Sequence, residues 1–197
     1  MTILHLLRHG ERESGRVLVG RTPGIALTER GRAEIAAVAG RLGDANIAAI
    51  YASPLQRTRE TAEILSERLS LPVEYREGLT ELDFGEWTGS TFDQIRDDPR
   101  WPLWRDMRSV ASIPGGESMR EVQRRAVEEM FDIHTRHGHD PVVIVSHGDV
   151  IRAALMFALG MPLDFYRRIE IAQASISTIH IEPNMIRVLS MNERPHL

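Results

Sequence analysis

The tripeptide Arg8-His9-Gly10 stands directly behind a short, mostly apolar run, residues 3–7. Such a run is typical of a buried strand, which would deliver two reactive side chains at its carboxyl end, and the glycine permits a tight turn there. Imidazole is a competent nucleophile near neutral pH, and guanidinium is the side chain best suited to hold a phosphoryl group. These residues therefore indicate phosphohistidine chemistry; the alternative is a strand end with an incidental basic pair.

A second apolar run, residues 142–145, ends in Ser146-His147-Gly148, where a helical pattern begins. In open parallel α/β sheets, sites form just beyond the carboxyl ends of the strands. Two strands that both end in His-Gly are thus expected to place His9 and His147 in one crevice, although a buried structural His147 is the alternative. Free N–H groups at the helix start suit an anion, so Gly148 is predicted to bind substrate.

A third short strand is predicted to end at Ser53, and the following helix carries Arg57 in its first turn. Pro54 is well placed near a helix start, because its missing N–H is not needed there. An arginine at this position can reach the same crevice, whereas a lone arginine is ordinarily solvated. Arg59 has no such support and is interpreted as a solvated residue.

Residues 79–89 form an acidic, aromatic and glycine-punctuated segment, which is typical of a loop that covers a site. A leaving alkoxide needs a proton, and a carboxylic acid held near apolar groups can supply it. The residues alone leave three candidates for this donor: Glu81, Asp83 and Glu86.

Taken in order, these motifs resemble those of the histidine phosphatase superfamily, which includes cofactor-dependent phosphoglycerate mutases and bacterial phosphomonoesterases. The resemblance covers nearly the whole chain. Any one motif is weak, but the ordered set is specific. The set comprises Arg8-His9-Gly10, Leu27-Thr28-Glu29-Arg30-Gly31, Ser53-Pro54-Leu55-Gln56-Arg57, Glu81-Leu82-Asp83-Phe84-Gly85, Trp87-Thr88-Gly89, Gly115-Gly116-Glu117-Ser118 and Ser146-His147-Gly148.

The resemblance implies that His9 becomes phosphorylated and that Glu81 donates the proton to the leaving group. It further implies that Arg8, Arg57 and His147 surround the phosphoryl oxygens. Clustered arginines favour the neutral imidazole that the attack requires. The pKa of Glu81 is lowered by these cations and raised by burial or bound phosphate, and we expect the acid limb of the activity profile to report on that balance.

The chain departs from the family pattern at Gly15, where many members have an asparagine that helps to bind phosphate. The loop carries instead three arginines, Arg12, Arg16 and Arg21. Arg21 is predicted to bind substrate, either in place of that asparagine or through a second acidic group, with a surface arginine as the alternative. This loop suggests a polyanionic or carboxylated phosphate ester as the substrate; the alternative is that the cap selects a bulky nucleotide-like or sugar group.

The elements that must position these residues alternate between strand and helix patterns, which predicts an α/β fold. We expect a three-layer α/β/α arrangement over residues 1–197 as a single domain: a mostly parallel sheet, helices on both faces and an antiparallel edge strand. A small helical cap is predicted as an insertion at about 90–116. Strands are predicted near 2–7, 47–52, 72–75, 141–146, 175–182 and 185–191, and helices near 28–42, 55–69, 117–137 and 149–159.

Composition narrows the function classes. The chain of 197 residues has a net charge of −4, which implies no global attraction to nucleic acid, and no cysteine, which excludes disulfides and thiol catalysis. No apolar stretch reaches membrane-spanning length and no signal peptide is apparent, so a cytoplasmic protein without membrane attachment is expected. No metal or other cofactor is predicted, and the exposed edge hairpin is expected to be able to support a homodimer.

Three functions are weighed on the sequence. The favoured one is a metal-independent phosphomonoesterase that acts through a phosphohistidine on a small phosphate ester. The second is a phosphoglycerate mutase-type phosphotransfer, although the known mutases tend to carry a larger insertion than residues 90–116. The third is a phospho-ligand binding protein without catalysis, which the retained motif residues argue against.

Overall fold

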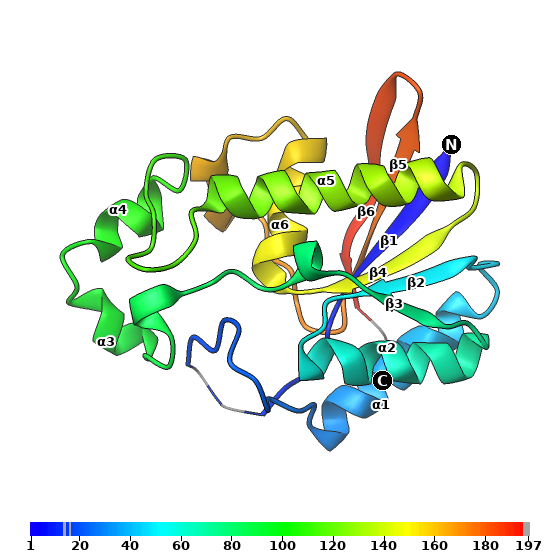
Figure 1. Ribbon diagram of the computed structural model, residues 1–197, viewed down its shortest axis with the longest axis horizontal. Helices are drawn as coiled ribbons and strands as arrows, with labels where there is room; N and C mark the ends of the chain where they lie inside the picture. Colours follow the sequence, from blue (N-terminus) through cyan, green and yellow to red (C-terminus); the bar gives the residue numbers. More distant parts are fainter. Residues whose placement is uncertain (14, 16, 195–197) are drawn as a thin grey trace.

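The computed structural model describes residues 1–13, 15 and 17–194, so the predicted contribution of Arg16 lies outside the described residues. A six-stranded sheet with the order β3-β2-β4-β1-β5-β6 forms the centre of the molecule (Figure 1). Its strands are β1 (Thr2–Arg8), β2 (Ala49–Ala52), β3 (Val73–Tyr75), β4 (Val142–Ser146), β5 (Ile176–Glu182) and β6 (Met185–Glu193).

The first four strands of the chain run parallel, and the last two complete the sheet in antiparallel fashion. Strands β1 and β4 pair in a register that sets Arg8 opposite Ser146, so the two His-Gly motifs leave the sheet side by side. The mostly parallel sheet with an antiparallel edge is therefore confirmed. Strand β6 extends beyond the predicted end at 191, to Glu193, and the homodimer stays a prediction.

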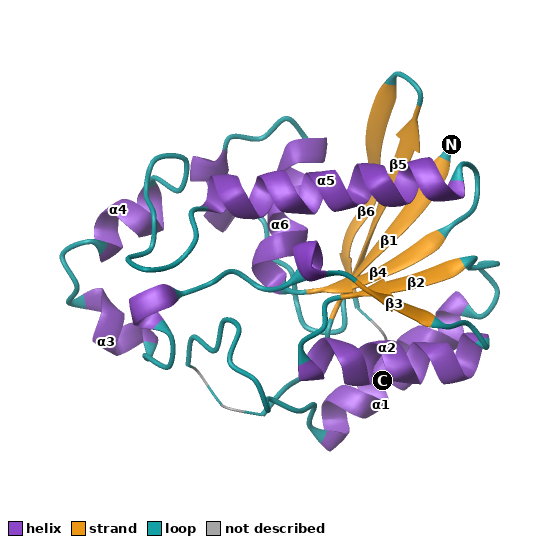
Figure 2. Ribbon diagram, in the orientation of Figure 1, coloured by secondary structure: helices purple, strands orange, loops and turns teal. Residues whose placement is uncertain are grey.

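Helices cover both faces of the sheet, as predicted for a three-layer fold (Figures 1 and 2). One face is covered by α1 (Glu29–Leu42) and α2 (Gln56–Leu69), and the other by α5 (Met119–His137) and α6 (Gly148–Ala158). Strand side chains alternate between two separate cores: Val143 packs toward the first helix pair, whereas Ile144 packs toward the second. Apolar residues at helical spacing complete both cores.

The cap contains two short helices, α3 (Phe92–Arg96) and α4 (Trp101–Asp106). Thr91 and Gln94 form a capping box at the start of α3. Figure 1 shows the cap beyond the end of the sheet toward which the parallel strands run. The single-domain organisation with an insertion at about 90–116 stays a prediction. No helix within the described part of the chain is both long and apolar enough to cross a membrane.

Three short 3₁₀ turns lie in the segments that connect these elements to the site. Turn η1 (Glu77–Leu79) leads into the acidic segment, η2 (Gly85–Trp87) lies within it, and η3 (Leu163–Arg168) follows α6. Hydrogen bonds join the cap to these turns. The indole nitrogen of Trp87 donates to Asp98 (2.9 Å), and the backbone N–H of Ser109 donates to Asp164 (2.8 Å).

Candidate active site

A cavity of about 320 Å³ opens between the carboxyl ends of the parallel strands and the cap. It holds five of the predicted site residues: Arg8, His9, Arg57, Glu81 and Gly148. His147 is fully buried, with its ring centroid 5.3 Å from that of His9. Further cavity-lining residues come from the loop after β1, the cap, α6 and η3: Arg12, Val17, Leu18, Val19, Gly20, Phe84, Phe92, Trp101, Trp104, Arg108, Asp149, Arg152 and Tyr166.

The position of His9 defines which ring nitrogen can react. Its Nδ1 lies 2.8 Å from the carbonyl oxygen of Gly10, which can only accept a hydrogen bond. In the neutral ring the proton therefore sits on Nδ1, and the lone pair sits on Nε2. Burial, reinforced by the charges of Arg8 and Arg57, holds the pKa of His9 well below its ordinary value. The imidazole is thus neutral at pH 7, with a lone pair on Nε2 that is available for reaction.

His147 is oriented by a serine at the end of β2. The hydroxyl of Ser53 lies 2.7 Å from His147 Nε2 and accepts a hydrogen bond from the backbone N–H of Leu55 (3.4 Å). This pattern favours donation of the hydroxyl proton to Nε2, which places the ring proton on Nδ1. That nitrogen is buried without a partner among the described residues. Burial, with the positive charge of Arg57 adding to it, lowers the pKa of His147 well below its ordinary value.

A buried guanidinium group, that of Arg57, and a half-buried one, that of Arg8, supply the positive charge. Arg57 is 1% exposed and donates from Nη2 to the carbonyl oxygen of Gly20 (2.7 Å), while its Nε and Nη1 have no partner in the described structure. Burial lowers the pKa of Arg57 to about 10, so it remains charged at pH 7. Arg8 donates from Nη1 to the carbonyl oxygen of Ile171 (2.6 Å).

Gly148 brings the start of α6 against Arg8. A Cβ atom at Gly148 would lie 3.3 Å from Arg8 Cζ, so the absence of a side chain allows the guanidinium to rest on the helix backbone. Nε of Arg8 is buried and has no partner in the described part of the chain. Unpaired buried donors are costly, and here donors from β1, α2 and the end of β4 gather in one place. The arrangement suits an anion with several acceptor oxygens.

Only one of the three candidate acids reaches the cavity. Glu81 is 9% exposed, lines the cavity and accepts a hydrogen bond from the backbone N–H of Leu82 (2.9 Å). Asp83 instead caps the backbone N–H of Gly85 (2.9 Å), and Glu86 pairs with Arg100 at the surface (3.2 Å). The structure therefore separates the acids that the residue types alone could not.

The pKa of Glu81 is raised to about 7, mainly by burial and then by the nearby Asp149. Arg57 and Arg8 oppose this rise. The effect of burial on the pKa therefore outweighs that of the two cations, and a substantial fraction of Glu81 is protonated near neutral pH. A carboxylic acid with this pKa is suited to give a proton and later to take one back.

The structure places Arg21 outside the cavity lining. Its Nε donates to the backbone carbonyl oxygen of Glu81 (2.9 Å), and its Nη2 pairs with Glu117 (2.8 Å). Glu117 also accepts from the backbone N–H of Asp83 (3.1 Å) and pairs with Arg125 (3.0 Å). Arg21, Glu117 and Arg125 thus anchor the backbone of the acidic segment from outside the cavity lining. We infer that Arg21 positions Glu81.

A sequence profile of the histidine phosphatase superfamily (branch 1) matches residues 4–194. The chain belongs to this superfamily. It is 31% identical over 204 residues to phosphoserine phosphatase 1 of Hydrogenobacter thermophilus, across 100% of this chain and 95% of that protein.

Solved structures of other histidine phosphatases share the fold. YhfR of Bacillus stearothermophilus superposes with a TM-score of 0.91 at 31% identity, covering 98% of both chains. A mycobacterial glucosyl-3-phosphoglycerate phosphatase, Rv2419c, superposes with a TM-score of 0.86 at 30% identity, covering 96% of this chain and 98% of that one.

In this histidine phosphatase several cavity residues escaped the sequence analysis. Asp149 and Arg152 lie three apart in the first turns of α6 and form an ion pair (3.4 Å), a spacing that the sequence does display. Arg108 and Tyr166 carry no sequence signal, because irregular segments bring them to the cavity. Arg12, by contrast, was named in the sequence analysis, and it lines the cavity from the loop that contains Gly15.

The inferred positioning role of Arg21 predicts a selective loss in kcat. An Arg21→Gln variant is expected to lower kcat about tenfold, because Glu81 loses a support of its backbone and misplacement is costly to the transition state. KM should change little, since Arg21 does not face the substrate. Steady-state kinetics beside the exposed-site control Arg59→Gln would measure this; a rise in KM at constant kcat would instead indicate a substrate contact.

Proposed function

We propose that this histidine phosphatase is a metal-independent phosphomonoesterase, which hydrolyses a small phosphorylated metabolite through a phosphohistidine at His9. One observation carries the proposal. The Nδ1 proton of His9 is committed to the Gly10 carbonyl, which leaves a neutral Nε2 among buried donors that have no partner in the described structure.

In the first step, Nε2 of His9 attacks phosphorus and the bond from phosphorus to the ester oxygen breaks. The electron pair of that bond passes to the leaving oxygen, which takes the proton of Glu81 and departs as an alcohol. Arg8, Arg57 and His147 stabilise the charge on the phosphoryl oxygens in the transition state. The cations Arg8 and Arg57, together with the neutral donor His147, supply the charge stabilisation that a metal ion supplies in other phosphatases.

In the second step, water attacks the phosphohistidine. Glu81, now a carboxylate, accepts a proton from that water, and the bond from phosphorus to nitrogen breaks. Inorganic phosphate leaves, and both His9 and Glu81 return to their starting protonation states. The cavity needs only one proton carrier for the two steps, which fits a carboxyl group with a pKa near the working pH.

Hydrolysis is favoured over mutase chemistry by the size of the cap and by two phosphatase-named relatives, while another relative is named a probable phosphoglycerate mutase. The cap contributes only two short helices between the acidic segment and the Gly-Glu-Ser motif. The relatives described above bear the names of phosphatases for phosphoserine and glucosyl-3-phosphoglycerate. Both names give a small phosphate ester as the substrate of the protein that bears the name.

The test is a panel of phosphate esters, incubated with purified protein in EDTA, with free phosphate and isomerised product measured together. The expected result is phosphate release that persists in EDTA and disappears in a His9→Ala variant. Isomerisation of 3-phosphoglycerate without release would reassign the chain to mutase chemistry. Tight binding of esters without either product would favour a binding protein.

The pH dependence is expected to follow Glu81. A proton donor acts in its protonated form, so kcat/KM should fall about tenfold per unit as pH rises above about 7. This alkaline limb, rather than the acid limb expected from the sequence, reports on Glu81. His9 stays neutral at mildly acidic pH, because its pKa is lowered.

Pairing two glutamine variants checks this assignment. Glu81→Gln is expected to lower kcat/KM at pH 6 by about 10²- to 10³-fold and to flatten the alkaline limb. Glu86→Gln, which changes an exposed acid on the same segment, should keep both rate and profile. An unchanged alkaline limb in Glu81→Gln would refute the donor role.

A further inference from the structure

The cap end of the cavity contains a second group of donors that the phosphoryl chemistry does not use. Arg108 follows α4 and lines the cavity together with Trp104. Its guanidinium lies against two rings, with Cζ 4.2 Å from the centroid of Trp104 and 4.0 Å from that of Tyr166. Stacking of this kind fixes the plane of the guanidinium but satisfies none of its N–H groups.

The donors at this end of the cavity are buried and unpaired. Arg108 is 8% exposed, and no hydrogen bond or ion pair joins its Nε or Nη1 to any residue that the structure describes. The indole nitrogen of Trp104, which is 1% exposed, lacks a partner in the same described part. Both groups can only donate, so the ligand group that satisfies them must be an acceptor.

Arg152, the neighbouring cavity arginine, is already engaged. Its Nε donates to the carbonyl oxygen of Ile169 (2.8 Å), and its Nη1 pairs with Asp149 (3.4 Å). Arg108 has no comparable carboxylate partner among the described residues. It is therefore the cation at this end that is left for a ligand.

The net charge of the cavity also favours an anionic group on the ligand. Five arginines and two carboxyl groups are found among its described lining residues, an excess of four positive charges when Glu81 is protonated, as the first step requires. A phosphate monoester dianion neutralises two of these charges. Positive charge remains, which favours a further anionic group on the substrate.

The backbone beside Arg108 is held in place before any ligand binds. The next residue, Ser109, donates from its N–H and its hydroxyl to the two carboxylate oxygens of Asp164 (both 2.8 Å). Asp164 belongs to the same turn as Tyr166, on which Arg108 stacks. Preorganised donors recognise an anion with less loss of entropy than mobile ones.

We propose that Arg108, with the indole N–H of Trp104, forms a carboxylate subsite, so that the substrate is the phosphate monoester of a small carboxylic acid. A carboxylate is planar, anionic and acceptor-only, which suits these donors and the remaining positive charge. This assignment rests on the proposed function, because it takes the His9 end of the cavity as the phosphoryl site. It moves recognition of a carboxylated ester from the 11–21 loop to the cap.

Two esters that differ in one group provide the test. 3-Phosphoglycerate carries a carboxylate where glycerol 3-phosphate carries a hydroxymethyl group. Wild-type protein is expected to favour the first ester in kcat/KM by about 10- to 100-fold. Arg108→Gln should reduce this ratio to within about threefold of unity, and Arg108→Lys, which keeps the charge, to an intermediate value.

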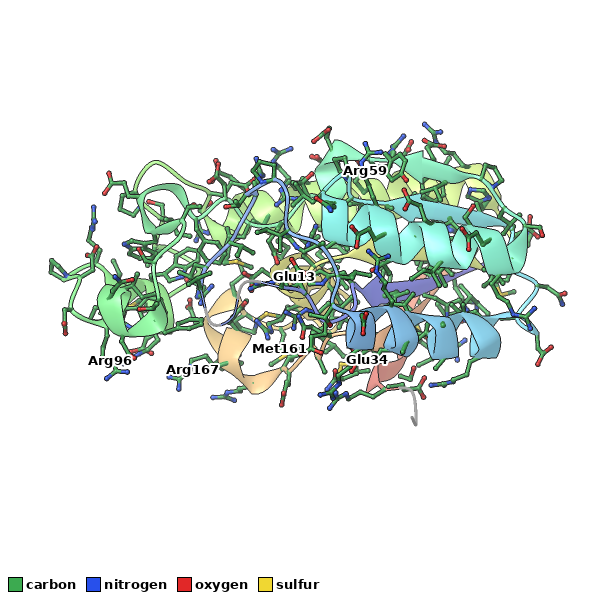
Figure 3. All side chains as sticks on the ribbon, turned by 90° about the horizontal axis from the view of Figure 1, so that it is seen from below. Glu13, Glu34, Arg59, Arg96, Met161 and Arg167 are labelled. Carbon is green, nitrogen blue, oxygen red and sulfur yellow. The ribbon has the colours of Figure 1, made fainter. Side chains whose placement is uncertain are left out.

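Arg167→Gln is the matched control. Arg167 lies on the neighbouring turn, is 68% exposed and points outward from the molecule in Figure 3. This variant should keep the wild-type ratio. If Arg108→Gln does not fold, as judged by thermal unfolding, the ratio in Arg108→Lys decides. A ratio unchanged by the Arg108 substitutions, or near unity in wild-type protein, would overturn the subsite.

Binding separates this proposal from the proposed function. In the His9→Ala background, calorimetry should show that 3-phosphoglycerate binds at least about tenfold more tightly than glycerol 3-phosphate, and that Arg108→Gln removes the difference. That binding result without hydrolysis by wild-type protein would support the subsite and refute the phosphatase. Hydrolysis with no effect of Arg108 on either ratio would support the phosphatase and refute the subsite.

Discussion

A His9→Ala variant is expected to lose at least about four orders of magnitude in kcat/KM. The side chain supplies the attacking atom, and no other nucleophile replaces it, because Nδ1 of neighbouring His147 is expected to carry its ring proton. The ring of His9 is nearly buried, so thermal unfolding must show that the variant is folded. Phosphate release from the preferred ester is the measurement.

A histidine outside the site provides the control for this loss. His139 is exposed near the end of α5 and contacts only the chain terminus among the interactions described. His139→Ala should retain wild-type kcat/KM. Residual turnover by His9→Ala above about one hundredth of the wild-type rate would exclude His9 as the essential nucleophile.

The second large effect is expected at Arg57. An Arg57→Met variant should lower kcat/KM by about 10³-fold, because it removes a preorganised cation from the transferring phosphoryl group. Arg59→Gln is the matched control. It changes an arginine two residues along the same helix, which lies at the surface in Figure 3, and should keep full activity.

The Arg57→Met substitution is expected to lower activity but to raise the stability of the fold. Its guanidinium is almost completely buried without an ion-pair partner in the described structure, and burial lowers its pKa. Removing such a charge is expected to raise the free energy of unfolding at pH 7 by about 1 to 3 kcal/mol. Inorganic phosphate should raise the melting temperature of wild-type protein and have a much smaller effect on Arg57→Met. Lower stability of the variant in the absence of phosphate would argue for a structural role instead.

Much of the fold follows from the sequence, because the spacing of apolar residues and the residues that end each segment predict the same elements. The run at 142–145 and the apolar stripe of α5 each predict one element, and the structure confirms both. Element ends are less determined. Helix α5 begins at Met119, two residues after its predicted start, because Ser118 and Glu121 form the capping box there.

The close packing behind the nucleophile could not be predicted from residue types. Gly31 of the Leu-Thr-Glu-Arg-Gly motif touches the backbone at Gly10 and Glu11, where a Cβ on Gly31 would lie 2.1 Å from the Glu11 carbonyl oxygen. The motif is visible in the sequence, but the contact joins the loop after β1 to α1. Only the folded chain reveals that this glycine lets the helix support the His9 turn.

Side-chain roles that depend on a further contact in the folded protein could not be predicted from the sequence. The types and positions of His9 and Arg57 indicate their chemistry, whereas the choice of Glu81 over Asp83 and Glu86 came from the family resemblance. The tautomer of His9 depends on the carbonyl of Gly10, and the place of Arg21 depends on Glu117. Such partners are distant in sequence or belong to the backbone, so no motif encodes them.

The most direct test of the account is to trap the covalent intermediate. Protein mixed with its preferred ester, labelled in the phosphoryl group, should be quenched with alkali within a single turnover, digested and mapped by mass spectrometry. We expect an acid-labile phosphoryl group on the peptide that contains His9, and none in the His9→Ala variant. Phosphate release at the wild-type rate with no label on His9 at any time would contradict the mechanism.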